Sequence, residues 1–132
     1  LALQSMDVSS GIIRWIDLPL DFKKVGYTTP LIVEIKNVGA STVYSLTVAY
    51  CDEHDDVRVL HIAGGGFLLN TGATVIVDAT TYYLHNGTSS LMKSIRSGDF
   101  PSISPNSRKI IGVSADANTS LDVSVRCNLR WL

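Results

Sequence analysis

The chain has 132 residues, of which 45% are hydrophobic and 17% charged, and its formal net charge is −1. This size and composition predict one domain, residues 1–132, with a hydrophobic core of its own. A near-zero charge without a basic run argues against a nucleic-acid or membrane-surface binder, and no apolar stretch approaches the roughly 20 residues that cross a bilayer. We therefore expect no nucleic-acid partner and no membrane insertion.

The first 25 residues give ambiguous structural signals. Residues 1–6 are too few for a secretory signal and lack its basic start. Because the chain begins with Leu rather than Met, we expect a processed chain or a fragment of a longer protein. Residues 12–20 are rich in apolar side chains and could form one strand, which Pro19 would interrupt.

Short segments of β character then follow at close intervals. Residues 31–36 place Leu31, Val33 and Ile35 on one face, and residues 43–51 place Tyr44, Leu46, Val48 and Tyr50 on one face. Further β segments are expected at residues 57–62, 67–69, 73–78, 81–84 and 109–113. Gly, Asn and Pro mark turns between them, and Asn86-Gly87 is typical of a hairpin turn. This spacing favours an all-β antiparallel sandwich or barrel.

The C-terminal third contains one helix candidate and the clearest strand pattern. In residues 89–97, Leu91, Met92 and Ile95 have helical spacing, Ser89 or Ser90 is a plausible N-cap, and Gly98 would end the helix. We therefore expect at most one short helix. Residues 121–131 alternate for eleven residues, with apolar side chains from Leu121 to Trp131 on one face, and predict a half-buried strand that fixes the C-terminus in a sheet.

The densest group of ligand-type side chains lies at residues 52–56, Asp-Glu-His-Asp-Asp. Its carboxylates could hold a hard cation such as calcium, but the spacing is not that of an EF-hand loop. We favour a solvated hairpin loop that joins two strands.

No other motif predicts catalysis, a metal or a cofactor. The three glycines at residues 64–66 lack the Lys and helix of a phosphate-binding loop and indicate a hairpin connection. His54, His61 and His85 have no recognisable nucleophile partner. Cys51 and Cys127 could form one disulfide, although buried free thiols are the favoured interpretation. We expect no catalytic residue and no cofactor.

Three aromatic residues are candidates for interaction or sugar stacking: Tyr82, Tyr83 and Trp15. Because Tyr82 and Tyr83 are adjacent, a strand would point them to opposite faces, one toward the core and one toward solvent. Trp131 shares the apolar face of the terminal strand and is expected to be buried.

Short motifs of the C-terminal third occur in a characteristic order: Tyr83-Leu84-His85-Asn86-Gly87, Ser97-Gly98-Asp99-Phe100-Pro101, Ile103-Ser104-Pro105-Asn106-Ser107, Arg108-Lys109-Ile110-Ile111, Val123-Ser124-Val125 and Arg130-Trp131-Leu132. Over about residues 81–132 this order resembles the C-terminal domain of the distal tail proteins of long-tailed bacteriophages. Pro105-Asn106-Ser107 stands where that family has Pro-Gly-Asn, and residues 1–80 do not resemble its ring-forming N-terminal domain. The resemblance implies a galectin-like or jelly-roll-like β-sandwich, in which Gly98, Asp99, Phe100 and Pro101 form a structural loop.

The resemblance further implies a non-enzymatic structural or attachment component of the virion, of tail or baseplate type, assembled in the host cytoplasm. Its partners would be other virion proteins, copies of itself and host-surface glycans, and the family offers no catalytic residue to carry over. Two alternatives stay open: a carbohydrate-binding module cut from a larger enzyme or adhesin, and a capsid decoration protein. A hydrolase with a spatially assembled site is a third, less favoured hypothesis.

Overall fold

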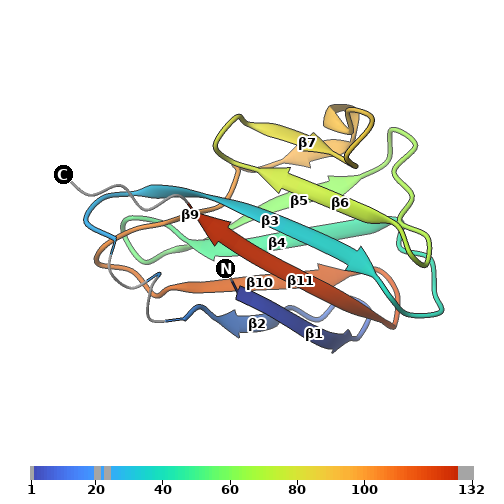
Figure 1. The fold of residues 1–132 in the computed structure, drawn as a ribbon, viewed down its shortest axis with the longest axis horizontal. Helices are drawn as coiled ribbons and strands as arrows, with labels where there is room; N and C mark the ends of the chain where they lie inside the picture. Colours follow the sequence, from blue (N-terminus) through green and yellow to red (C-terminus); the bar gives the residue numbers. More distant parts are fainter. Residues whose placement is uncertain (1, 20–21, 23–24, 128–132) are drawn as a thin grey trace.

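The computed structural model describes residues 2–19, 22 and 25–127. In chain order the elements are β1 (Ala2–Val8), β2 (Arg14–Asp17), β3 (Thr29–Asn37), β4 (Ser45–Cys51), β5 (Val57–Ala63), β6 (Thr74–Asp78), β7 (Tyr83–His85), the 3₁₀ turn η2 (Met92–Ser94), β8 (Ile95–Ser97), β9 (Ser102–Ile103), β10 (Ile110–Ala115) and β11 (Thr119–Cys127). One sheet has the order β1-β11-β3-β6-β7, with β9 paired to β3, and the other has the order β2-β10-β4-β5-β8 (Figure 1). All pairs are antiparallel, so the predicted β-sandwich is confirmed.

The core lies between the two sheets, where the alternating apolar side chains of each strand meet. On β3 and β11 the cross-strand pairs Val33–Val125 and Ile35–Val123 face inward. From the other sheet, strands β4, β5 and β10 contribute side chains with no exposed surface: Leu46, Val48, Leu60, Ile62, Ile111 and Val113. The predicted alternation along residues 31–36 and from Leu121 onward is thus the physical basis of the sandwich.

One buried polar residue fixes the end of β3. Asn37 has no exposed surface, and its Nδ2 donates to the carbonyl oxygens of Ser41 at 2.7 Å and Leu69 at 2.9 Å. Its Oδ1 accepts hydrogen bonds from the amide of Gly39 at 3.1 Å and the hydroxyl of Thr119 at 2.9 Å. Every polar group of this side chain is therefore paired, and the side chain ties β3 to β11 and to the chain on either side of the β4–β5 hairpin.

The prediction of a helix at residues 89–97 is wrong in its length, because the helical part is much shorter. Only Met92–Ser94 form a 3₁₀ turn, Leu91 precedes it without a side-chain cap, and Ile95–Ser97 form strand β8, which pairs with β5. The segment has only modest helical propensity, and its last three residues instead form hydrogen bonds with the edge of the second sheet. Within the described residues no helix has the length and apolar character of a membrane span.

Other differences from the sequence expectations concern short or edge segments. Residues 67–69 form no strand, although Leu69 makes an isolated bridge with Val43. Residues 12–20 are not one strand, since β2 covers only Arg14–Asp17, and β1 was not predicted. Tyr44 is 58% exposed and does not share the buried face of β4. The end of the predicted terminal strand, including Trp131, lies outside the described residues.

Candidate binding surfaces

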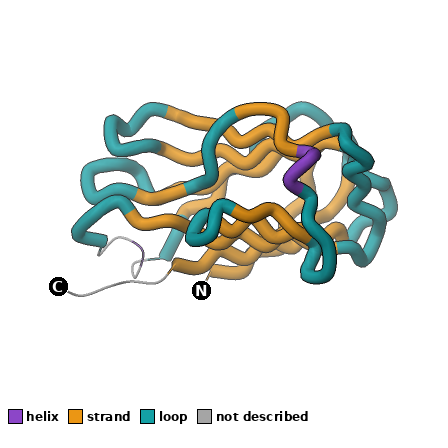
Figure 2. Tube along the Cα trace, turned by 90° about the horizontal axis from the view of Figure 1, so that it is seen from above, coloured by secondary structure: helices purple, strands orange, loops and turns teal. Residues whose placement is uncertain are grey.

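Figure 2 shows the loops that join the strands gathered at the ends of the sandwich. A cleft opens among the loops at one of these ends. It has a volume of about 580 Å³, and we call it the end cleft. Four segments line it: the start of β3, the β4–β5 hairpin, the β6–β7 turn and the chain between β8 and β9. The lining residues are Thr28, Pro30, Tyr50, Asp52, Glu53, Arg58, Ala79, Tyr82, Asp99, Phe100, Pro101 and Ser102.

Two aromatic rings meet in the wall of the end cleft. Tyr82 is 71% exposed, and its ring lies edge-to-face against Phe100 with 5.9 Å between ring centroids. Tyr82 has a φ of +54°, a conformation that non-glycine residues rarely adopt. The turn that precedes β7 therefore holds a large aromatic side chain out toward solvent at the rim of the cleft.

The charged groups of the end cleft are mostly acidic. Asp52 Oδ2 accepts a hydrogen bond from Arg58 Nε at 2.7 Å, which lowers the pKa of Asp52. Burial raises the pKa of the Tyr50 phenol, and the nearby Asp99 carboxylate raises it further. Asp99 is thus close enough to affect a tyrosine that reaches the cleft from the buried face of β4.

The loop formed by Gly98, Asp99, Phe100 and Pro101 is anchored at three of its four residues. Gly98 has a φ of +91° and lies against the backbone of β5, where a Cβ would collide with the carbonyl oxygen of Val59. Phe100 packs against the core, and the carbonyl oxygen of the buried Pro101 accepts a hydrogen bond from the Leu31 amide at 3.1 Å. The side chain of Asp99 alone is exposed, so this loop presents a carboxylate from a fixed backbone.

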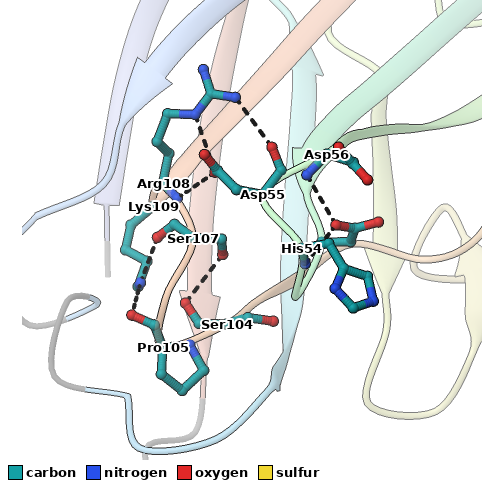
Figure 3. A network of polar contacts seen from close by, with 9 residues as sticks. His54, Asp55, Asp56, Ser104, Pro105, Ser107, Arg108 and Lys109 are labelled. Atoms are coloured by element: carbon teal, nitrogen blue, oxygen red, sulfur yellow. Dashed lines mark hydrogen bonds and ion pairs between the residues drawn. The ribbon is translucent and has the colours of Figure 1, made fainter.

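The acidic segment at residues 52–56 is the β4–β5 hairpin loop that the sequence predicted. Asp52 Oδ1 accepts hydrogen bonds from the amides of His54 and Asp56, while Asp55 Oδ1 accepts them from the amide and Nε of Arg108 at 2.9 and 3.1 Å (Figure 3). These bonds lower the pKa of Asp55. Among the described residues no group of three His, Cys, Asp or Glu side chains is placed to hold a metal ion.

Next to this loop, a buried lysine closes the turn before β10. Lys109 Nζ donates to the carbonyl oxygens of Pro105 at 2.8 Å and Ser107 at 2.6 Å (Figure 3). Ser107 Oγ in turn donates to the carbonyl oxygen of Ser104 at 3.1 Å. The turn at residues 104–109 is therefore held by its own side chains beside the Asp55–Arg108 pair.

The three aromatic candidates lie on separate parts of the molecule. Tyr82 lines the end cleft, whereas Tyr83 stacks on His85 of β7 with 4.8 Å between ring centroids. Tyr83 is 38% exposed, so the expectation that one of the two adjacent tyrosines enters the core is wrong. The positive φ of Tyr82 places it in the turn before β7 and breaks the alternation assumed for a strand. Trp15 lies on β2, an edge strand of the other sheet.

A row of apolar residues crosses the outer face of the second sheet. The strand registers place Trp15 of β2 beside Gly112 of β10, Gly112 beside Ala49 of β4, and Ala49 beside Val59 of β5. We call these four residues the apolar row. Trp15 and Val59 are each 39% exposed, and the Trp15 ring covers Gly112, where a Cβ would lie 2.9 Å from Trp15 Cε3. Val57, which is 50% exposed, adds to this surface on β5.

On the outer face of the first sheet, polar pairs lie at the edge formed by β1 and β11, whereas Ile32 and Ile76 lie farther along this face. There the pairs between β1 and β11 are polar, with hydrogen bonds from Ser5 Oγ to Asp122 Oδ1 at 2.6 Å and from Ser120 Oγ to Asp7 Oδ1 at 2.5 Å. An outward face of an antiparallel sheet is usually polar in this way. The large exposed apolar side chains Trp15, Val57 and Val59 thus lie on the outer face of the second sheet.

The two cysteines are free thiols on different sheets. Cys51 ends β4 and is buried, while Cys127 ends β11 and is partly exposed. His61 Nδ1 lies 3.3 Å from Thr47 Oγ1 on the neighbouring strand, in keeping with the structural role expected for it.

Comparison with known proteins shows a shared fold. No known family model matches this chain, and no curated protein matches it in sequence. Among solved structures, the chain resembles the SPP1 Dit (gp 19.1) protein, which is described as a paradigm of the hub adsorption apparatus in phages that infect Gram-positive bacteria. The TM-score is 0.55 at 12% sequence identity, over 97% of this chain and 48% of that protein. The chain thus spans about half the length of that hub protein.

Proposed function

We propose that this chain is a non-enzymatic structural or attachment component of a bacteriophage tail, and that it works in the virion through protein–protein contacts. The observation that carries the proposal is the likeness in fold to a phage hub protein over 97% of the chain. The motifs of residues 81–132, which resemble the distal tail family, support the same conclusion from the sequence.

The apolar row supplies the surface for these contacts. Within the row Ala49 and Gly112 are buried, and the exposed apolar surface comes from Trp15 and Val59, with Val57 on the same strand as Val59. Large apolar side chains exposed together on a soluble protein can mark an interaction site, and closed symmetric assemblies are the commonest oligomers of identical chains. We therefore expect copies of this chain to associate through the outer face of the second sheet, with Val59 and Trp15 at the contact.

Light scattering after size exclusion, over a wide range of protein concentration, tests this surface. The wild-type chain is expected to form a defined oligomer, and Val59→Lys is expected to stay monomeric because the contact would bury an unpaired ammonium group. Val38→Lys is the matched control, because Val38 is 41% exposed but follows β3 in the other sheet. A wild-type monomer at every concentration would overturn self-association through this face.

A further inference from the structure

The end cleft combines an exposed ring, a partly buried ring and an excess of negative charge. Three carboxylates line it, from Asp52, Glu53 and Asp99, against one guanidinium, from Arg58. Arg58 is already paired with Asp52 at 2.7 Å. Among the residues that the structure describes, no ion pair neutralises Asp99, and the exposed His54 lies 3.7 Å from Glu53.

The side chain of Tyr50 adds a second and independent feature. Tyr50 is only 4% exposed and still lines the end cleft. Its hydroxyl makes no hydrogen bond to the described residues and is not a fully buried atom, so the phenol oxygen opens onto the cleft from an otherwise buried side chain. The Tyr50 oxygen and the Asp99 carboxylate can therefore both accept hydrogen bonds from a donor group of another molecule.

We infer that the end cleft binds an arginine side chain presented by an extended segment of a partner protein. A guanidinium group is planar and carries five N–H donors, so it can stack on the Tyr82 ring while it donates to Asp99 and to the Tyr50 oxygen. The cleft volume of about 580 Å³ also leaves room for the residues on either side of that arginine. This inference rests on the proposed function, because it names the chemistry of one tail-protein contact.

The charge of the cleft favours this partner over a sugar. A neutral sugar could stack on Tyr82 and accept or donate hydrogen bonds, but it would add no charge opposite to that of the carboxylates that line the cleft. A guanidinium group adds a positive charge and forms charge-assisted hydrogen bonds, which are about twice as strong as neutral ones.

The test is a titration of the full chain, followed by amide NMR spectra at low salt. The probe is the peptide acetyl-Gly-Ser-Arg-Ser-Gly-amide, and its control is the same peptide with citrulline, which keeps the shape but not the charge. We expect saturable shifts at Tyr82, Asp99 and Phe100, an affinity about tenfold lower for the citrulline peptide, and weaker binding as salt is added.

Two variants locate the interaction. Asp99→Asn is expected to weaken binding of the arginine peptide several-fold, and it should fold normally because the Asp99 side chain is exposed. Glu34→Gln is the matched control, since it removes one carboxylate from the outer face of β3 and should leave the affinity unchanged. Equal affinity for both peptides, or shifts that appear with N-acetylglucosamine or maltose and not with the arginine peptide, would overturn the inference.

This test separates the cleft from the proposed function. Failure of the arginine peptide would leave the oligomeric state and its sensitivity to Val59→Lys untouched. A monomeric wild-type chain, in contrast, would count against the apolar row and would leave the titration of the end cleft unaffected.

Discussion

Gly98 lies directly against the carbonyl oxygen of Val59, so that the loop after β8 touches the backbone of β5 at a point where no side chain fits. The φ of +91° also requires glycine. We expect Gly98→Ala to lower the free energy of unfolding by more than about 2 kcal/mol. Gly87→Ala is the control, because Gly87 has a φ of +94° with no atom within 4 Å of the added Cβ, and should cost only about 1 kcal/mol. Urea unfolding measures both, and equal losses would contradict the close contact.

The hydrogen bonds of Asn37 predict a large effect from one polar substitution in the core. Asn37→Ala leaves the Leu69 carbonyl and the Thr119 hydroxyl without this partner and should cost about 3 kcal/mol. Thr119→Val removes one of the four bonds and should cost about 1 kcal/mol. Thermal unfolding of both variants compares them. If Asn37→Ala cost no more than Thr119→Val, Asn37 would not be the centre of this network.

The Asp55–Arg108 pair predicts a loss of stability in acid. Hydrogen bonds from Arg108 lower the pKa of Asp55 in the folded chain. A carboxyl whose folded pKa lies below its unfolded value of about 3.9 stabilises the fold above that pH, and this contribution disappears as the pH falls through the folded pKa. The difference in Tm between wild type and Asp55→Asn should therefore shrink as the pH falls below about 4. Asp56→Asn is the control, because the Asp56 side chain accepts no hydrogen bond among the described residues, and a constant difference for Asp55→Asn would contradict the pairing.

The two thiols should differ in reactivity. Cys51 is 1% exposed, and burial raises the pKa of its thiol, so little of the reactive thiolate is accessible. Burial also raises the pKa of Cys127, but this residue keeps partial exposure. Iodoacetamide at mildly alkaline pH should therefore modify Cys127 first, as peptide mass spectrometry would show. Equal rates in the folded protein would mean that the end of β4 opens readily.

Period-2 alternation predicted the strands that form the core, because β3 and β11 are long and each buries one face. It failed where the chain leaves the strand conformation at a single residue. At Tyr82 a positive φ replaces the expected strand geometry, and at Ile95–Ser97 the edge of β5 offers hydrogen bonds that a short helix does not. Local propensity was overridden by tertiary pairing at β8.

Neither binding surface could be predicted as such from the sequence. The end cleft draws its residues from four segments that are distant in the chain, although Tyr82 and the loop that starts at Gly98 were both candidates. The apolar row depends on strand register. Nothing in the sequence around Gly112 or Ala49 indicates a surface, and only the register places them between Trp15 and Val59. Both surfaces arise from the topology rather than from a motif.

The most direct test of the proposed tail role is to locate the protein in phage particles released by cells that carry its gene. Gold-labelled antibodies raised against the full chain would be imaged on purified particles by electron microscopy. The proposal predicts label at one end of the tail in most particles. Particles without label, together with abundant protein in the same cell lysate, would contradict a structural role in the virion.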